Sequence, residues 1–485
     1  MQQGCGLLAL FIGCLRFLYL RADFPNFSPW SVDQAKYTDE GWWASAAIRH
    51  RLLGHWNLPG DYNPAVVLPV WPCSLDILFR FTGVSMVAAR ALSVATSIAT
   101  LTLVALLVRR YTRPGSGWAP VLAVLLLSTS PFAFVYSRLA ILDTFVIFQF
   151  CLLMLIASYA DENRVAALAS VAVLIPVIVL TKTTAVVLLP AVAWLLWRAM
   201  TGTPTKIRML AVGLVGLIAA LLVRAYVAFV FLRGHEIDYR EFYDVNSLTP
   251  IDWTQTIGIL EEIFVRCMWI GRIVFPLAIA LVALAILWLR TIWRNPLFVA
   301  SCLAIAGQVT FLFATQGSFA PRYFLPMLVP IVVLIALTME ELKTRVTTKS
   351  YDFTLVLVGI ALVLNILMIR SFLAHRTFQF YDAARSVERT VRADANSNHL
   401  ILGVSAADLS LITGLPSIND VYGTQSLPER IATYKPDWYL AWNGVGSVEQ
   451  DALAGYRIEK VAAYPAFDDD ERDILVLYRL RADNQ

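Results

Sequence analysis

Long blocks of apolar residues, separated by polar turns, recur along the first three quarters of the chain. A helix needs about 20 apolar residues to cross the hydrocarbon core of a bilayer. Only 15% of the 485 residues are charged, against about 25% in an ordinary soluble domain, and the mean hydropathy is +0.65. The pattern therefore predicts a polytopic α-helical membrane protein.

We expect about eleven transmembrane helices within residues 1–370. Residues 21–82 form a long, aromatic and proline-rich polar loop after the first span, and a second long loop covers 233–272. The predicted spans are 6–20, 84–108, 118–136, 145–160, 165–180, 185–200, 209–232, 273–289, 297–315, 323–337 and 353–369.

Lysine and arginine are distributed unequally between the short loops on the two sides of the membrane. One side carries Arg138, Lys182 and Arg322. The other carries Arg109, Arg110, Arg113, Arg164, Arg198, Lys206, Arg208, Arg290, Arg294, Lys343, Arg345 and Lys349. The basic side is expected to be cytoplasmic. This places the N-terminus inside and the C-terminus outside a plasma (inner) membrane.

Residues 371–485 have the composition of a soluble domain. Stretches at 399–404, 437–442 and 473–478 predict buried strands, and stretches at 406–412 and 427–434 predict helices. Strands that alternate with helices favour a small α/β domain, here extracytoplasmic. The acidic run at 468–471 is interpreted as a solvated turn.

Several function classes are excluded by what the sequence lacks. A net charge of +4 is too mild for a nucleic-acid partner. The six cysteines form no CxxC pair, so they predict neither a disulfide framework nor a metal site. There is no GxGxxG, P-loop, HExxH or nucleophile-elbow motif. Carboxylates and isolated basic residues on the exterior side are the remaining candidates for chemistry.

The loop after the first span contains the adjacent acids Asp39 and Glu40, preceded by Thr38 and followed by Trp42 and Trp43. Thr38 is interpreted as the N-cap of a helix whose first turn carries both acids. Tryptophans favour the membrane–water boundary. We therefore expect an interfacial helix that presents two carboxylates to a site. The alternative is that the acids only cap the helix.

The other exterior charges lie at the ends of spans, where they can meet in one cavity. A carboxylate there can take the proton of an attacking hydroxyl, and a cation can neutralise a departing phosphate. Asp39 is the first candidate for the base and Glu40 the second. Asp143 can orient an acceptor, hold a metal or pair with Arg138.

Lys182 lies between two spans and needs a partner, unless it snorkels to water. Arg322, followed by Tyr323, is a candidate phosphate ligand or a boundary anchor.

These motifs resemble the GT-C membrane glycosyltransferases of the protein O-mannosyltransferase and aminoarabinose transferase group. The resemblance rests on the Asp39-Glu40 pair, the turn from Arg138 to Asp143, the turn that carries Lys182, and the Pro-Arg-Tyr that ends at Tyr323. It implies catalysis by Asp39 with Glu40 as its neighbour, and a substrate site formed by Arg138, Asp143, Lys182, Arg322 and Tyr323.

The resemblance further implies a polyprenyl-phosphate sugar donor and inverting transfer to a hydroxyl of a protein, lipid A or a glycan. No cofactor is implied, and the need for a divalent cation stays open. Asn63-Pro64-Ala65 stands where many aminoarabinose-transferase-like members have Lys-Pro-Pro. The alternatives are a flippase for a lipid-linked saccharide and a membrane-anchored binding protein. The flippase is disfavoured because the charges gather at one face and no broken repeat halves appear.

Overall fold

The computed structural model describes residues 2–25, 33–113, 117–246, 257, 274–314, 320–345, 347–467 and 472–482. The α-helices before the C-terminal domain are α1 (Gln2–Cys14), α2 (Asp39–Leu53), α3 (Val70–Thr82), α4 (Met86–Tyr111), α5 (Trp118–Thr129), α6 (Pro131–Tyr136), α7 (Leu142–Ser158), α8 (Arg164–Thr181), α9 (Leu189–Ala199), α10 (Thr205–Leu232), α11 (Glu236–Val245), α13 (Val274–Trp288), α14 (Pro296–Ala314), α15 (Leu325–Arg345) and α16 (Thr348–Ala374). Short 3-10 helices are η1 (Leu15–Phe17), η2 (Gln34–Lys36), η3 (Pro64–Val66), η4 (Tyr159–Asp161), η5 (Thr183–Leu188), η7 (Arg290–Arg294) and η8 (Pro321–Phe324).

Each of the eleven predicted apolar blocks contains a helix, so the expectation of a polytopic helical protein is confirmed. Among the described residues, seven helices are long and apolar enough to cross a membrane: α4, α7, α8, α10, α14, α15 and α16. The predicted span 118–136 is divided into α5 and α6 at Ser130. There the Ser130 hydroxyl accepts a hydrogen bond from the Ala133 amide at 3.2 Å, and Pro131 starts the new helix.

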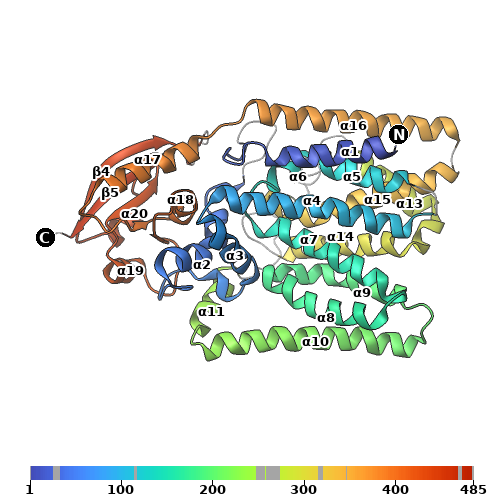
Figure 1. Ribbon diagram of the computed structural model, residues 1–485, viewed down its shortest axis with the longest axis horizontal. Coiled ribbons are helices and arrows are strands. Elements are labelled where there is room, and N and C mark those ends of the chain that lie inside the picture. The colour runs from blue at the N-terminus through green and yellow to red at the C-terminus, as the bar shows by residue number, and fades with distance from the viewer. Residues whose placement is uncertain are drawn as a thin grey trace.

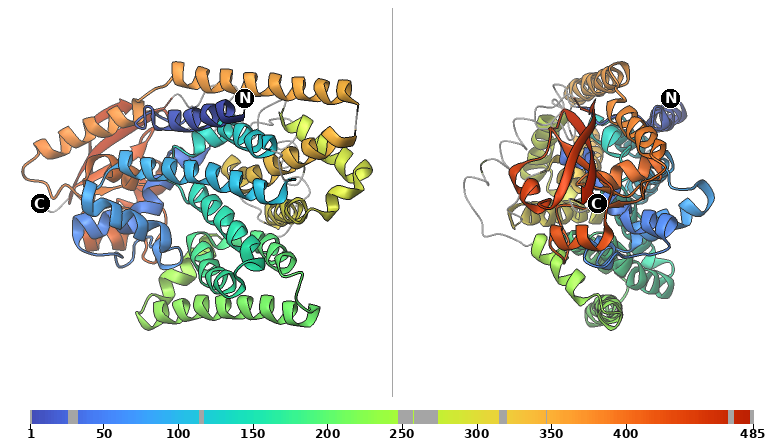
Figure 2. Two further views of the ribbon diagram at one scale, coloured as in Figure 1. Left: turned by 45° about the vertical axis from the view of Figure 1, so that its right-hand side comes forward. Right: turned by 90° about the vertical axis from the view of Figure 1, so that its left-hand side faces the viewer.

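The spans run side by side in one bundle, and the sheet and helices of the C-terminal domain all lie at one end of it (Figure 1). Helices α2, α3 and α11 lie between the bundle and that domain (Figures 1 and 2). Helix α15 is the most buried span, with 89% of its apolar window inside the protein, whereas α10 has only 17%. The bundle therefore has a packed centre around α15, and α10 lies at its edge, where it packs on α8 and leaves most of its own surface exposed.

The C-terminal domain contains a five-stranded sheet in the order β2-β1-β3-β5-β4. Its elements are α17 (Gln379–Ala393), β1 (Ile401–Leu402), α18 (Ala406–Thr413), β2 (Ser417–Ile418), α19 (Leu427–Tyr434), β3 (Trp438–Trp442), α20 (Ser447–Ala452), β4 (Tyr456–Pro465) and β5 (Ile474–Ala482). β1 pairs with β2 and β3 in parallel, and β5 pairs with β3 and β4 in antiparallel.

The expectation of a small α/β domain is confirmed, together with β1, β3, β5, α18 and α19 near their predicted positions. The sequence reasoning missed β2, which has two residues, and β4, a strand at the sheet edge that is half-buried on one face only. The predicted acidic turn at 468–471 lies outside the described residues.

Helix α2 begins at Asp39, as expected for the interfacial helix, and ends at Gly54, whose φ of 74° is a conformation that glycine adopts without strain. It packs on α3 and, across the domain boundary, on α18. The C-terminal domain thus rests directly on the helix that carries the acidic pair.

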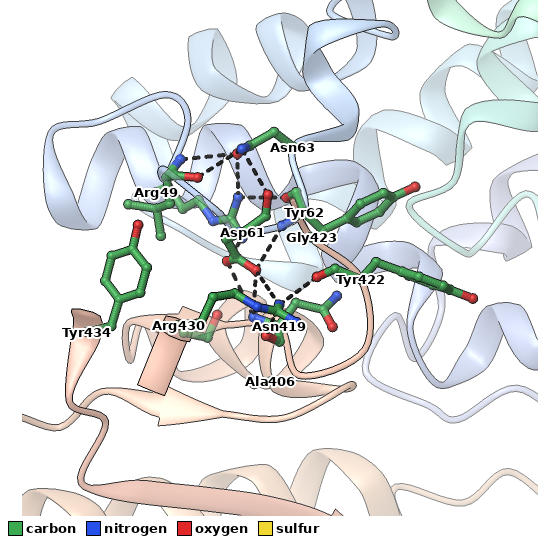
Figure 3. Close-up of polar contacts among 12 residues, drawn as sticks. Arg49, Asp61, Tyr62, Asn63, Ala406, Asn419, Tyr422, Gly423, Arg430 and Tyr434 are labelled. Atoms are coloured by element: carbon green, nitrogen blue, oxygen red, sulfur yellow. Dashed lines mark hydrogen bonds and ion pairs between the residues drawn. The ribbon is translucent and has the colours of Figure 1, made fainter. Parts of the chain in front are cut away.

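A buried ion-pair network fastens the second half of α2 to the C-terminal domain (Figure 3). The Asp61 carboxylate is fully buried and pairs with Arg49 of α2 and with Arg430 of α19, whose Nη1 lies 3.2 Å from Asp61 Oδ1. The Asn419 amide donates to the same oxygen at 3.1 Å. Arg430 also donates to the carbonyl oxygens of Asn419 and Tyr422, both at 2.5 Å. One carboxylate therefore holds two cations from distant parts of the chain.

We expect Asp61→Ala to lower the free energy of unfolding by about 3–5 kcal/mol, because it leaves two guanidinium groups buried without their counter-ion. The matched control is Asp161→Ala, which removes an exposed carboxylate that pairs with Arg110 and should cost less than about 1 kcal/mol. Thermal unfolding in detergent measures both variants. Equal stabilities would contradict the assignment of this network as a fastening point.

Candidate active site

Asp39 is the first residue of α2, and its side chain is buried, with only 4% of the residue exposed. Its Oδ2 lies 3.0 Å from Nη2 of Arg322, a residue of η8 at the start of the α15 span. Burial raises the pKa of the Asp39 carboxyl above 3.8, and the nearby Asp33 and Asp143 raise it further, whereas Arg322 lowers it. Asp39 is thus a buried carboxylate at the end of the bundle, next to one strong cation.

Arg322 is held by two carboxylates. It forms a close ion pair with Asp33, and its backbone amide donates to Asp33 Oδ2 at 3.1 Å. The Tyr136 hydroxyl donates to that same oxygen at 2.6 Å. Asp33 therefore fixes both the backbone and the side chain of Arg322, and the second end of the guanidinium reaches Asp39.

Lys182, at the C-cap of α8, places its Nζ 2.6 Å from Oδ1 of Asp143, in the first turn of α7. The ammonium lies 5.0 Å from the centre of the Tyr323 ring, and Arg322 Cζ lies 5.1 Å from the same ring. The expectation that Lys182 needs a partner is confirmed, because its ammonium group pairs with Asp143 instead of reaching water. Tyr323 contacts both cations through its π-system.

Glu40 faces away from this group of charges. Its carboxylate receives two hydrogen bonds from Arg90 of α4, at 2.8 and 2.5 Å, and a third from the Ala140 amide at 2.7 Å. Arg90 also donates to the carbonyl oxygens of Leu20 and Ala22, at 2.7 and 2.8 Å. The oxygens of Glu40 are thus occupied by structural bonds, so the geometry favours Asp39 over Glu40 as a base.

Arg138 does not pair with Asp143, so that alternative is wrong. Its Nη2 donates to the Tyr19 carbonyl oxygen at 2.7 Å, and its guanidinium lies over the rings of Phe134 and Phe372. Arg138 follows α6, whereas Asp143 starts α7 and is taken by Lys182. The structure therefore brings together Asp39, Asp143, Lys182, Arg322 and Tyr323, and leaves Arg138 and Glu40 with other partners.

The first turn of α2 is not capped as expected. Thr38 occupies the N-cap position, but its side chain makes no capping bond to the helix backbone. Instead, the Gly41 amide donates to Oδ1 of Asp408, in α18 of the C-terminal domain, at 3.0 Å. The local sequence cannot reveal such a cap, because its acceptor lies 367 residues further along the chain.

Sequence reasoning also missed Asp33 and Arg90. Asp33 offers no motif, since it is a single acid in an aromatic loop. Arg90 did carry a signal, because it lies inside the predicted span 84–108, where a charge needs a partner. That partner is Glu40.

No group of three or more Asp, Glu, His or Cys side chains among the described residues has the arrangement of a metal site. The charges of the site are three carboxylates, Asp33, Asp39 and Asp143, and two cations, Lys182 and Arg322. Such a set can accept one proton at a carboxylate and offers two cations that can contact an anion.

An apolar cavity of about 710 Å³ lies between α8, α9 and α10. Its lining includes Val179 and Val186, which flank Lys182 in the sequence, and Gly216 of α10. Arg224 is the only charged residue among those that line it. The cavity has the size and the aliphatic character of a site for a small apolar ligand or chain.

Comparison with known proteins gives one family and a set of solved structures. Residues 64–226 match the model of the dolichyl-phosphate-mannose-protein mannosyltransferase family. The crystal structure of ArnT from Cupriavidus metallidurans in the apo state superposes with a TM-score of 0.64 at 13% identity, and covers 98% of both chains. The same protein bound to undecaprenyl phosphate gives 0.60 at 12% identity over 97% of both chains. The archaeal oligosaccharyltransferase AglB from Archaeoglobus fulgidus gives 0.56 at 11% identity, over 99% of this chain and 74% of that one.

No curated protein sequence matches the chain. The GT-C fold that the motifs imply is confirmed by the structural matches, which extend over the membrane bundle and the C-terminal domain alike. The family match includes Arg138, Asp143 and Lys182, but neither Asp39 nor Arg322.

We expect Asp39→Asn to leave the thermal stability unchanged or slightly raised, because it removes one charge from a buried group with an excess of carboxylates. Arg322→Gln is the contrasting variant. It leaves Asp33 and Asp39 buried without a cation and should cost about 3–5 kcal/mol.

The stabilities of the wild type and Asp39→Asn should also differ in their dependence on pH. The pKa of Asp39 is raised in the folded state. Its stabilising contribution to the free energy of unfolding is therefore complete below pH 3.8 and is lost as the pH rises through the higher folded-state pKa. Asp39→Asn should lack this decline. Unfolding midpoints measured from acid to neutral pH test this, and parallel curves for the variant and the wild type would contradict the buried position of Asp39.

Proposed function

We propose that the protein is a membrane glycosyltransferase. It transfers a sugar from a polyprenyl-phosphate donor to a hydroxyl acceptor at the extracytoplasmic face of the membrane, with inversion at the anomeric carbon. The observation that carries this proposal is the position of Asp39 beside Arg322. Lys182 supports it, because Val179 and Val186 on either side of it in the sequence line an apolar cavity. The family and structural matches support the same class of reaction.

In the proposed reaction, the Asp39 carboxylate accepts the proton of the acceptor hydroxyl as its oxygen attacks the anomeric carbon of the donor. The new bond forms between that oxygen and the sugar, and the bond from the sugar to the phosphate oxygen breaks with its electron pair on the phosphate. Attack opposite the departing phosphate inverts the configuration. Lys182 and Arg322 neutralise the charge that develops on the phosphate.

Arg322 has a second task in this mechanism. Burial and the neighbouring carboxylates raise the pKa of Asp39, which favours the protonated form that cannot act as a base. The guanidinium of Arg322 opposes this shift, because it lowers the pKa of Asp39 and so favours the ionised form that can act as a base. Asp33 and Tyr136 hold Arg322 in place for this purpose.

The donor chain is assigned to the cavity between α8, α9 and α10. ArnT from Cupriavidus metallidurans binds undecaprenyl phosphate, which is the class of lipid that we propose here. An isoprenoid chain in the cavity would pass Val179 and Val186 and bring its phosphate toward Lys182. The unequal distribution of basic loop residues supports an exterior position for the site.

Asp39→Asn should reduce sugar transfer by roughly two to four powers of ten, which is what a general base contributes, with donor binding retained. The assay uses the purified protein, a polyprenyl-phosphate sugar and cell-envelope acceptors, and follows the release of polyprenyl phosphate. In the wild type the rate should fall on the acid side at a pH above 3.8, since the pKa of Asp39 is raised.

Asp161→Asn, in an exposed ion pair, serves as the control for this substitution. Unchanged turnover of Asp39→Asn would remove Asp39 from the mechanism. Movement of the donor between leaflets without cleavage would instead favour a flippase.

Gly216→Phe should raise the KM for a long-chain donor by filling the cavity, with little change in kcat. A Cβ atom at Gly216 would meet no atom of the described residues within 4 Å, so the backbone has room for a side chain that points into the cavity. Gly213→Phe is the matched control, because it lies one turn away in the same helix, has the same free space and does not line the cavity. Equal KM values for the two variants would contradict the assignment of the donor chain to this cavity.

A further inference from the structure

The N-terminal amides of α2 need acceptors from outside the helix. The first four N–H groups of any α-helix have no partner within it. In α2 the first intrahelical bond is from the Trp42 amide to the Thr38 carbonyl oxygen, at 2.9 Å. Gly41, two residues after Asp39, therefore depends on the carboxyl oxygen of Asp408. This oxygen does the work that an N-cap side chain does in other helices.

The contact requires α18 to approach the α2 backbone very closely. A Cβ atom on Gly41 would lie 2.1 Å from the Asp408 backbone nitrogen and 2.3 Å from the Ala407 carbonyl carbon. Only glycine leaves room for this approach. Directly beside it, the Trp42 indole donates to the Val404 carbonyl oxygen at 3.0 Å. The first turn of α2 is thus bonded to the C-terminal domain through two consecutive residues.

We propose that Asp408 is a positioning residue for Asp39, and that the C-terminal domain completes the active site by capping the helix that carries the base. The inference rests on the proposed function only for its effect on turnover. Asp408 touches no substrate. It acts by holding the first turn of α2 in the conformation that places Asp39 beside Arg322.

The chemistry of Asp408 fits a cap rather than a second acid–base group. It is buried, and its second oxygen, Oδ2, has no hydrogen-bond partner within the part of the chain that the structure describes. Burial, together with repulsion from Glu40 and Asp39, raises its pKa well above 3.8. A neutral carboxyl group still accepts a hydrogen bond at Oδ1, so the cap does not need a charge. Asparagine offers the same acceptor.

The second contact region, formed by Asp61 with Arg49 and Arg430, lies further along α2 and holds the helix as a whole (Figure 3). It does not reach the first turn, because Asp39 lies ten residues before Arg49. The first turn is held by the Asp408 cap and by the ion pair of Glu40 with Arg90. Asp408 is therefore the contact whose loss should affect Asp39 without releasing the domain.

The direct test is hydrogen–deuterium exchange of the full-length protein in detergent, read on the peptide that contains Gly41. Asp408→Ala should speed exchange of the first-turn amides by roughly five- to thirtyfold, which is the effect of losing an N-cap. Asp408→Leu keeps the branching at Cγ but offers no hydrogen-bond acceptor and should show the same increase, whereas Asp408→Asn should exchange like the wild type. Asp451→Ala, an exposed acid of α20, is the control.

The exchange experiment needs no enzymatic activity, so it separates this inference from the proposed function. Slow first-turn exchange in both Asp408→Ala and Asp408→Leu would overturn the cap, whatever the protein catalyses. In the transfer assay, Asp408→Leu should lower kcat by a similar factor with the donor KM unchanged, and Asp408→Asn should restore it. Fast exchange in Asp408→Leu with undiminished kcat would overturn the link to Asp39.

Discussion

The buried ion pair between Glu40 and Arg90 is the contact on which the site depends. Charges at the edge of a bilayer are tolerated when they are paired and hydrogen-bonded. Here Arg90 reaches the chain at Leu20 and Ala22, and Glu40 reaches the turn at Ala140. One pair thus joins α2, α4, the chain that follows α1 and the turn between α6 and α7. Asp39 precedes Glu40, so this pair and the Asp408 cap together set its position.

The adjacent acids Asp39 and Glu40 therefore have different roles. Glu40 makes three short hydrogen bonds to structural groups, whereas Asp39 has one cation at 3.0 Å and neighbouring carboxylates. Successive residues of a helix point about 100° apart, so Glu40 faces Arg90 of α4 and Asp39 faces Arg322 at the start of the α15 span. The hydrogen-bonding capacity of Glu40 is thus used by structural groups, whereas Asp39 keeps capacity for a substrate. Such an uneven allocation is what tunes carboxylates for proton transfer.

The sequence was sufficient for those features that depend on composition and local pattern. Apolar block length predicted the spans, and the motifs predicted one site made of seven residues: Asp39, Glu40, Arg138, Asp143, Lys182, Arg322 and Tyr323. Five of them lie together, whereas Glu40 and Arg138 have other partners. The sequence could not show how they pair. Lys182 takes Asp143, and Arg138 turns to the Tyr19 carbonyl oxygen, because three-dimensional proximity rather than spacing along the chain decides the partner. Asp33 and Asp408 were missed for the same reason, since their partners lie hundreds of residues away.

The missing side chain at Gly41 has a consequence for how the protein can change. A soluble domain that makes no close backbone contact with its neighbour can be exchanged for another domain. Here the backbone of α18 occupies the space where any residue other than glycine at position 41 would have its Cβ atom. A foreign domain would have to approach α2 equally closely and supply a hydrogen-bond acceptor for the Gly41 amide. The membrane bundle and the C-terminal domain must therefore evolve, or be engineered, as one inseparable unit.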